Sequence, residues 1–352
     1  MLDLSFYKGK RVLVTGHTGF KGTWLTKILV GAGAEVIGYS LNPPTEPNLY
    51  TLAEVDDKIE SVIGDIRDYD KLLGVFVKYK PQIVFHLAAQ PIVRESYREP
   101  RYTYETNVMG TVNILECVRV TECVKSFLNV TTDKVYKNDD VPNHPFSEDE
   151  PLDGYDPYSN SKSCSELVTH SYKKSFFSDG RCAISTARAG NVIGGGDFSA
   201  DRIIPDCVRS LIDKKDITVR NPNSTRPYQH VLEPLCVYLE IAQKQYDDIT
   251  YSGYYNVGPD DCDCVTTGEL VDKFCRMCGN IKWINKHDGG PHEAEFLKLD
   301  NSKIKKVFAW SPRWHIDEAM DKIVEWTRGY ISDERTVPGI MDKQIAEFFG
   351  KI

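Results

Sequence analysis

An acid and a base stand side by side at Asp133 and Lys134, where the apolar segment 127–130 ends. The segment predicts a β-strand, and two charges at its end indicate either a solvated turn or a chemical site. A carboxylic acid and an amine in one place can protonate one atom of a substrate and remove a proton from another. The pair is therefore a candidate for acid–base chemistry, with the solvated turn as its alternative.

A tyrosine and a lysine lie four residues apart at Tyr158 and Lys162, and an apolar-periodic helix follows them. Residues at this spacing share one face of a helix. In that geometry an ammonium can lower the pKa of a phenol, so that the phenolate accepts a hydroxyl proton during hydride transfer. The spacing also arises as a simple surface pair, so its meaning depends on whether the chain has a cofactor site.

Three glycines, Gly16, Gly19 and Gly22, follow the first predicted strand and open a helix. They permit a tight turn, a close approach of the backbone to a pyrophosphate, and close packing of the helix on a sheet. Strand, glycine loop and helix in this order predict dinucleotide binding, with a structural turn as the alternative. The loop side chains expected to contribute are His17, Phe20 and Lys21.

The second predicted strand ends without the carboxylate that usually holds the ribose hydroxyl of NAD. Ser40 and Asn42 can bond a hydroxyl there, whereas His17 and Lys21 can favour a phosphate. NAD is the expected cofactor, and NADP is left open. Asp65, after the third strand, is expected to meet the adenine, with an ordinary turn aspartate as the alternative.

Alternating strands and helices must position these side chains in the first half of the chain. Such an order predicts a doubly wound parallel sheet. Past residue 188 the segments become short and mixed, which suits a smaller α/β lobe that closes over the carboxyl edge of the sheet. We therefore expect a dinucleotide-binding domain over 1–187 and a substrate-binding lobe over 188–352, with some segments returning to the core. The predicted strands are 11–14, 35–39, 83–87 and 126–130, and the predicted helices are 21–32, 68–79, 107–118, 158–176, 204–213 and 268–278.

The charge balance argues against nucleic acid as a partner. The 352 residues include 43 basic and 51 acidic side chains, a net charge of −8. The first residues lead directly into a strand without a charged-then-apolar leader, and no apolar run approaches ~18 residues. These features predict a cytoplasmic protein that does not bind membranes.

Ten cysteines in a chain of this length fit a reducing compartment better than a disulfide framework. Cys262 and Cys264, followed by Cys275 and Cys278, have spacings that can bind zinc. However, 268–278 reads as an amphipathic helix, on which the last two thiols share a face with Val271. We expect inert thiols and no metal.

Taken together, these motifs resemble the extended short-chain dehydrogenase/reductase superfamily. The residues that carry the resemblance are the glycine loop, His86 to Ala89, Asn107, the Tyr158/Lys162 pair, and Arg188 with Asn191. Within the superfamily, longer motifs resemble the CDP-glucose 4,6-dehydratases, at 16–22, 89–91, 133–134, 154–158, 187–197, 229–234 and 291–294. The likeness spans about residues 8 to 326.

The resemblance implies a Rossmann core, NAD, and a nucleotide sugar such as CDP-glucose in the C-terminal lobe. Tyr158 would accept the C4 hydroxyl proton, Thr132 would bond that hydroxyl, Asp133 would be the acid for water loss from C5 and C6, and Lys134 the base. Related dehydratases carry a glutamate at the position of Lys134. Further cofactor residues would be Ile66, Leu87, Ala88, Ala89 and Asn107, and the substrate residues would be Gln90, Arg94, Thr132, Asn191, Arg202, Arg226 and His230.

Two features depart from the pattern of the family. Residues 137–145 lack its usual tryptophans, and Tyr228 stands where tryptophan is common. The nucleotide base is therefore less fixed than the reaction. Alternative functions are a nucleotide-sugar 4-epimerase or reductase, which needs no elimination pair, and a non-catalytic dinucleotide-binding protein. The helices over 107–118 and 158–176 resemble those that form a dimer interface in the superfamily, which implies a homodimer or homotetramer.

Overall fold

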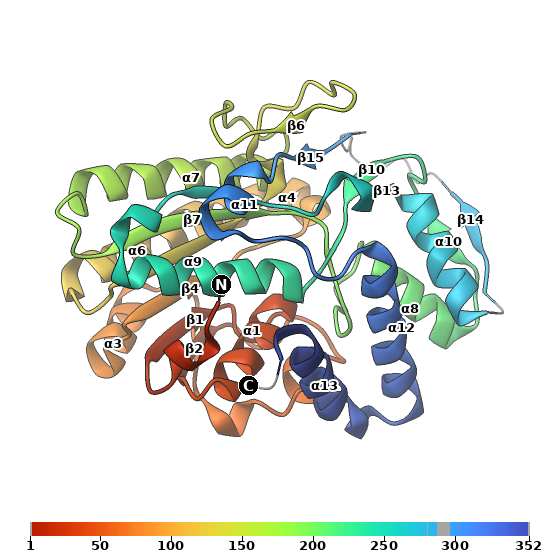
Figure 1. Cartoon of the computed structure of the whole chain (residues 1–352), viewed down its shortest axis with the longest axis horizontal. Helices are drawn as coiled ribbons and strands as arrows, with labels where there is room; N and C mark the ends of the chain where they lie inside the picture. Colours follow the sequence, from red (N-terminus) through yellow and green to blue (C-terminus); the bar gives the residue numbers. More distant parts are fainter. Residues whose placement is uncertain (1, 280, 287–295, 351–352) are drawn as a thin grey trace.

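The apolar segments predicted as strands form one parallel sheet in a computed structural model that describes residues 2–279, 281–286 and 296–350 (Figure 1). Its order is β12-β7-β5-β4-β1-β2-β3, so successive strands are added on one side of β1 as far as β3 and on its other side from β4 onward, and the order reverses between β1 and β4. A doubly wound sheet binds ligands at the carboxyl ends of the strands beside this reversal. The strands are β1 (Arg11–Thr15), β2 (Glu35–Ser40), β3 (Glu60–Ile63), β4 (Ile83–His86), β5 (Ser126–Thr131), β7 (Ala183–Ala189) and β12 (Tyr254–Val257).

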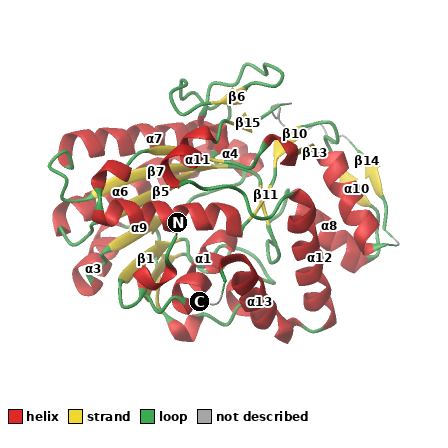
Figure 2. Cartoon of the chain, viewed as in Figure 1, coloured by secondary structure: helices red, strands yellow, loops and turns green. Residues whose placement is uncertain are grey.

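Helices cover both faces of the sheet, as continuously apolar strands require (Figure 2). In β1, Val12 and Val14 belong to the same core as Trp24, whereas Leu13 belongs to the opposite core with Phe76. The sheet thus separates two apolar layers. The first is formed with α1 (Phe20–Gly31), α9 (Leu232–Asp247) and α13 (Val337–Phe349), and the second with α3 (Tyr69–Tyr79), α6 (Gly110–Thr121) and α7 (Pro157–Phe176).

The doubly wound prediction is confirmed, and most predicted elements begin and end within one residue of the observed bounds. The helix predicted over 107–118 is the exception, because Glu105–Met109 form a wider π-helical turn and α6 starts at Gly110. Such turns interrupt α-helices mostly at functional sites. Asn107 lies within this turn.

A smaller lobe lies beside the sheet, on the right in Figure 1. Its own apolar core joins α8 (Ile203–Asp213), α10 (Thr267–Cys278) and α12 (Ile316–Ser332). The second half of the chain also contributes β12 and α9 to the main sheet and its cover, and the predicted boundary after residue 187 stays a prediction. Residues 291–294, one of the motifs noted above, lie outside the described residues.

Short strands form pairings outside the main sheet. Two-stranded pairings join β8 (Val192–Ile193) to β11 (Gln229–His230), β9 (Ile217–Val219) to β14 (Trp283–Asn285), β10 (Thr225–Pro227) to β13 (Cys264–Thr266), and β6 (Pro145–Phe146) to β15 (Lys298–Leu299). The remaining α-helices are α2 (Leu49–Leu52), α4 (Val93–Arg98), α5 (Pro100–Tyr104) and α11 (Ser302–Phe308). Among the described helices, none combines the length and the apolar character needed to cross a bilayer.

Candidate active site

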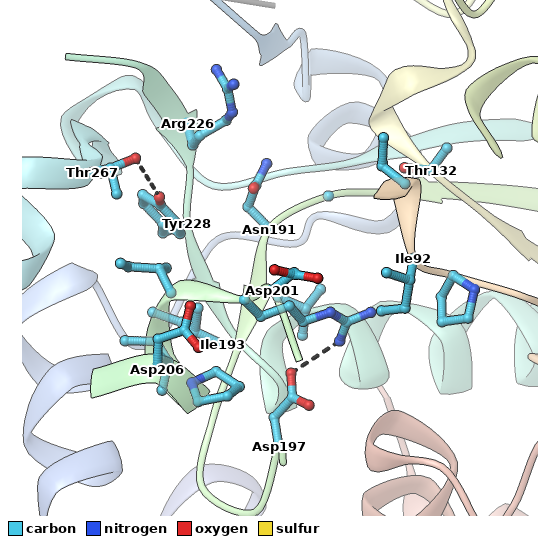
Figure 3. Close-up of a pocket in the computed structure, with 18 of the residues that line it drawn as sticks. Ile92, Thr132, Asn191, Ile193, Asp197, Asp201, Asp206, Arg226, Tyr228 and Thr267 are labelled. Atoms are coloured by element: carbon cyan, nitrogen blue, oxygen red, sulfur yellow. Dashed lines mark hydrogen bonds and ion pairs between the residues drawn. The ribbon is translucent and has the colours of Figure 1, made fainter. Parts of the chain in front are cut away.

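A cleft of about 600 Å³ opens between the carboxyl ends of the strands and the smaller lobe (Figure 3). Residues from both parts line it, which agrees with the place that a doubly wound fold reserves for ligands. Ten of the predicted site residues come together there: Phe20, Lys21, Arg94, Thr132, Asp133, Lys134, Tyr158, Asn191, Arg202 and Arg226.

The glycine loop packs so tightly that side chains are excluded from it. Gly16 has a φ of +76°, and a Cβ on it would lie 2.9 Å from the Ala88 backbone nitrogen. A Cβ on Gly22 would lie 2.0 Å from the Gly16 carbonyl oxygen. Gly19 is the N-cap of α1, and the hydroxyl of Thr15 accepts the N–H groups of Leu87 and Ala88, each at 3.2 Å. Bare backbone at a helix start fits a dinucleotide diphosphate.

The side chains around this loop do not all carry the charges that the sequence suggests. His17 is buried, its Nε2 lies 2.9 Å from the Ser61 hydroxyl, and burial lowers its pKa to about 4. It is therefore neutral at pH 7 and does not supply the cation expected for a 2′-phosphate. Ser40 shares a 2.8 Å hydrogen bond with the Thr18 hydroxyl, and Asn42 is exposed.

Asp65 is already engaged by an arginine that the sequence did not single out. Arg67 donates from Nη2 at 2.7 Å, and its hydrogen bond lowers the pKa of the Asp65 carboxyl. The Arg67 guanidinium lies 4.8 Å from the centre of the Tyr102 ring. Ile66 packs against Gly110, where a Cβ would approach its Cγ2 to 2.7 Å. The adenine contact of Asp65 stays a prediction.

Asn107 and Gln90 form a buried clamp behind the cleft. The Asn107 side chain accepts the Gln90 N–H at 2.8 Å and donates to the Gln90 carbonyl at 3.1 Å and to the Ser161 hydroxyl at 2.9 Å. The Gln90 amide donates to Thr103 and accepts from the Ile92 N–H. Gln90 does not line the cleft in the described structure, so we interpret it as support for the loop that follows Ala89.

Tyr158 and Lys162 lie on one face of α7, as their spacing predicts, but the phenol pKa is not lowered in the protein alone. Burial raises the pKa of Tyr158 to about 12, and a hydrogen bond with Thr132 only partly offsets this. Burial and then Lys21 lower the pKa of Lys162 to about 7, and its Nζ donates to the Val130 carbonyl at 3.1 Å. Lys21 also has its pKa lowered, to about 8, chiefly by burial.

Asp133 is a buried acid and not part of a solvated turn. Its side chain is 1% exposed, and burial raises its pKa despite the nearby Lys134. Thr132 donates from its hydroxyl to Oδ1 at 3.0 Å, and Asn191 donates from Nδ2 to Oδ2 at 3.1 Å. Lys134 follows in a short 3₁₀ turn, half-buried and lining the same cleft. A carboxyl group whose pKa is raised can hold a proton to donate.

The smaller lobe brings arginines to the other side of the cleft. Arg226 is 4% exposed, and its Nη1 donates to the Thr225 carbonyl at 2.9 Å. Arg202 pairs with Asp197 at 2.9 Å. Guanidinium groups of this kind suit a diphosphate.

Two cleft residues carry no sequence motif and were missed. Asp201 meets Arg220 of the lobe at 2.9 Å and Arg94 of α4 at 3.9 Å. The carboxylate therefore lies between cations from two distant parts of the chain. A φ of +58° at Asp201 marks the turn that presents it. No spacing rule links residues so far apart, so only the fold reveals the contact.

His230 does not line the cleft, which corrects its predicted role in substrate binding. It is fully buried, with its ring edge-on to Trp24 and Trp314. Its Nδ1 accepts the Leu232 N–H at 3.3 Å, and burial lowers its pKa to about 3. The ring is a core group at the start of α9.

A second buried carboxylate, Glu166, lies one turn beyond Lys162 on α7. It accepts from Arg188 at 2.9 Å and Thr186 at 2.8 Å, and also from Thr131. Arg188 leads the groups that lower the pKa of Glu166 to about 2 against the effect of burial. The spacing Tyr158, Lys162, Glu166 was the available signal, since each step is four residues.

The four cysteines weighed as zinc ligands do not form one cluster in the described part of the chain. There, the group of ligating side chains that meets within 4.8 Å is Cys262, Asp263 and His315. Asp263 also accepts the Ile316 N–H at 2.9 Å, so it caps α12. Cys275 and Cys278 lie on α10, half-buried beside the lobe core.

The fold and the paired Tyr158 and Lys162 beside a glycine loop define an extended short-chain dehydrogenase/reductase. The family model described as GDP-mannose 4,6 dehydratase matches residues 13–323, and the chain belongs to this family. It is 47% identical over 341 residues to CDP-glucose 4,6-dehydratase of Salmonella typhimurium, with 95% of each chain covered.

More distant relatives include both dehydratases and epimerases. The chain is 29% identical to UDP-glucose 4-epimerase of Mycolicibacterium smegmatis, over an alignment that covers 90% of this chain and 98% of that protein. The structure of dTDP-glucose 4,6-dehydratase from Bacillus anthracis in complex with NAD superposes with a TM-score of 0.76 at 22% identity, covering 94% of this chain and 100% of that one. The likeness to that structure shows the shared fold.

Proposed function

We propose that the protein catalyses the NAD-dependent dehydration of a nucleotide-activated hexose for deoxysugar biosynthesis. The proposed reaction converts CDP-glucose to CDP-4-dehydro-6-deoxyglucose and water. The observation that carries this proposal is the buried acid Asp133, with Lys134 beside it, in the same cleft as Tyr158. Similarity to CDP-glucose 4,6-dehydratase over nearly the whole chain supports the choice of substrate.

The residues present fit a nicotinamide dinucleotide. Bare backbone at Gly16 and the start of α1 suit the diphosphate, and the cations Lys21 and Lys162 repel each other without an anion between them. NAD bound there would take a hydride from C4 of the sugar and later return it to C6. The neutral state of His17 removes one of the two cations that favoured NADP. The remaining contacts, at Ser40, Asn42, Asp65 and Asn107, are part of the proposal.

In the first step, Tyr158 accepts the proton of the C4 hydroxyl while hydride leaves C4. Burial raises the phenol pKa to about 12 in the protein alone, so the phenolate needs added positive charge nearby. The oxidised nicotinamide and the ammonium of Lys162 would both supply it. Thr132, hydrogen-bonded to the phenol, orients the hydroxyl that loses its proton.

In the second step, the C4 ketone acidifies the proton at C5, and water leaves across C5 and C6. We assign Lys134 as the base that removes the C5 proton and Asp133 as the acid that protonates the departing C6 hydroxyl. Asp133 can start this step protonated because its pKa is raised by burial. The hydride would then return from the reduced nicotinamide to C6 while Lys134 gives its proton back to C5, so the cycle needs no external oxidant.

We assign the diphosphate of the substrate to the arginines of the lobe. Arg226 and Arg202 line the cleft opposite Asp133, and Arg94 approaches from α4. Bidentate guanidinium contacts would hold the two phosphates. Tyr228, hydrogen-bonded to Thr267 at 3.0 Å, lines the same side and is a candidate for the nucleotide end (Figure 3).

The test is to incubate the protein with NAD and CDP-glucose and to follow the product mass. Loss of one water and a 4-keto-6-deoxy sugar are expected. UDP-, dTDP- and GDP-glucose in parallel reactions identify the preferred base. An unchanged mass with a C4 epimer would establish the 4-epimerase function instead, and binding of NAD without any product would establish the non-catalytic alternative.

We further propose a homodimer through α6 and α7, with a tetramer as the alternative. Both helices expose large apolar side chains: Val120 on α6 at 44%, and Leu167 at 52% and Phe176 at 44% on α7. An apolar surface of this kind favours a second copy of the chain. Sedimentation of the wild type and of Leu167→Glu tests it, since the substitution should give a monomer if these helices form the interface.

We propose the cytoplasm as the compartment. All ten cysteines are free thiols, six of them at least partly accessible, which suits a reducing environment.

A further inference from the structure

We infer that Asn191 is a positioning residue for the acid Asp133 and holds its carboxyl group through a direct hydrogen bond. The resemblance to relatives assigns Asn191 to the substrate diphosphate. In the structure its Nδ2 instead donates to Asp133 Oδ2 at 3.1 Å. This inference rests on the proposed dehydration, in which Asp133 protonates the departing hydroxyl.

The backbone around Asn191 is built for this contact. Asn191 has a φ of +46°, a left-handed conformation that asparagine adopts more readily than most residues. The preceding Gly190 has no room for a side chain, because a Cβ would lie 1.7 Å from Asp133 Oδ2. The carboxyl group therefore rests against the main chain at Gly190 while the next residue binds it.

Strand β11 fixes this turn in place. Gln229 of β11 donates its N–H to the Asn191 carbonyl at 3.3 Å, and its side-chain amide donates to the Gly190 carbonyl at 3.3 Å and to the Val257 carbonyl at 2.8 Å. Gln229 is 2% exposed. The position of Asn191, and through it of the acid, thus depends on contacts from β11 and β12.

Two neutral donors hold the carboxyl group, one on each oxygen. Thr132 bonds Oδ1 and Asn191 bonds Oδ2, and both bonds favour the ionised form, against the effect of burial. Asn191 therefore keeps the acid oriented and also limits how far its pKa rises. The charged and titratable groups that face Asp133 from the surrounding elements are Lys21, Lys134, Tyr158, Arg226 and Tyr238.

Two substitutions test the role while preserving the left-handed turn. Asn191→Gly removes the amide, and Asn191→Asp places a second carboxylate against the first. Both should raise the pKa of Asp133, and aspartate should raise it more than glycine, because a second carboxylate adds like-charge repulsion to the loss of the hydrogen bond. Because the protonated acid is the active form, the pH above which water loss from CDP-glucose slows should rise in the same order. Water loss should also fall about tenfold at its optimum, whereas C4 hydride transfer, followed by nicotinamide absorbance, should change little.

A diphosphate ligand would behave differently. If Asn191 binds the diphosphate, both variants would raise KM for CDP-glucose, slow hydride transfer and water loss together, and leave the pH limit unchanged. That result overturns the inference. Asn143→Gly is the matched control, because Asn143 also has a left-handed φ of +60° but is exposed and distant from Asn191 in the sequence. It should leave both steps and the pH limit unchanged.

A measurement without substrate separates this inference from the proposed function. Aspartate labelled with 13C at its carboxyl carbon gives one NMR signal for Asp133, identified by its loss in Asp133→Asn. Its titration should shift upward in Asn191→Gly even if CDP-glucose is not the substrate. An unchanged titration in both variants overturns the inference, while failure of the wild type on CDP-glucose alone overturns only the choice of substrate.

Discussion

Asp133 and Glu166 are two buried carboxyl groups, close to the same strand and helix, with pKa values displaced in opposite directions. Burial raises the pKa of Asp133, whereas that of Glu166 falls to about 2. Glu166 receives a full cation from Arg188 at 2.9 Å together with hydroxyl donors. Asp133 is hydrogen-bonded by the neutral side chains of Thr132 and Asn191, and the nearby cations Lys134 and Arg226 offset its burial only in part.

The difference distinguishes a buried carboxylate with a structural role, Glu166, from one suited to proton transfer, Asp133. A buried carboxylate that is fully compensated stays ionised and holds elements together. One that is only partly compensated can exist in both protonation states near neutral pH. In this protein the compensated group joins β5, β7 and α7, and the other faces the cleft.

The largest contrast is expected in catalysis. Asp133→Asn removes the proposed acid, so water loss from CDP-glucose should slow by about a thousandfold, within the range of general acid–base catalysis. C4 hydride transfer should stay measurable by nicotinamide absorbance, because Tyr158 and Lys162 are untouched. Asp139→Asn, at an exposed carboxylate, is the control and should react normally. Equal loss of both steps would show that Asp133 is mainly structural.

The reverse contrast is expected in stability. Glu166→Gln leaves Arg188, 1% exposed, without its carboxylate, and should lower the free energy of unfolding by about 3–5 kcal/mol. Urea unfolding measures this. The matched control is Glu116→Gln, which breaks the partly exposed pair with Arg119 and should cost less than about 1 kcal/mol. Equal losses in the two variants would contradict the special role of the Glu166 pair.

Lowering the pH should remove the stabilisation that the Glu166–Arg188 pair provides. The folded pKa of Glu166 lies below its ordinary 4.5, so its contribution is complete above that pH and disappears as the pH falls toward 2. The displacement corresponds to about 3 kcal/mol. The difference in unfolding free energy between wild type and Glu166→Gln should therefore shrink between pH 4.5 and 2. A difference that stays constant over this range would contradict the assignment of charge.

The smallest expected effect is that of Asp133→Asn on the free energy of unfolding, and its sign is opposite to that of Glu166→Gln. The folded pKa of Asp133 lies above its ordinary 3.8, so the ionised group costs stability at neutral pH. Asp133→Asn should therefore raise the free energy of unfolding by about 1 kcal/mol at pH 7, the usual gain when a strained functional group is removed. The gain should vanish below pH 3.8. A loss of stability at pH 7 would mean that its hydrogen bonds outweigh burial.

The sequence predicts the sheet and the cofactor loop well because both rest on local signals. Apolar strands, and glycines where a Cβ would collide with backbone at Gly16 and Gly22, are readable residue by residue. Asp133 and Lys134 were also singled out, because charges at the end of an apolar strand are conspicuous, and both residues line the cleft. The family comparisons confirm the dehydratase resemblance.

Contacts between distant segments could not be read in this way. His230 belongs to a recognisable motif, yet its ring packs between two tryptophans, and the tryptophan positions give no sequence signal for that contact. The environment of a titratable group is equally hidden: the neutrality of His17 and the raised pKa of Tyr158 both arise from burial. The bond from Asn191 to Asp133 joins residues 58 positions apart.

The Gln229-anchored turn at Gly190 and Asn191 has a practical consequence for lobe exchange among relatives. A chimaera joined after residue 187, the predicted boundary, would take the turn from the donor of the proposed substrate lobe and the proposed acid Asp133 from the donor of the sheet. A donor with a bulkier residue at the position of Gly190 would collide with the acid even if it recognised its nucleotide correctly. A junction placed after Asn191, with Gln229 retained, would keep the contacts among Gln229, Gly190 and Asn191. New nucleotide specificity could then be introduced without changing the surroundings of Asp133.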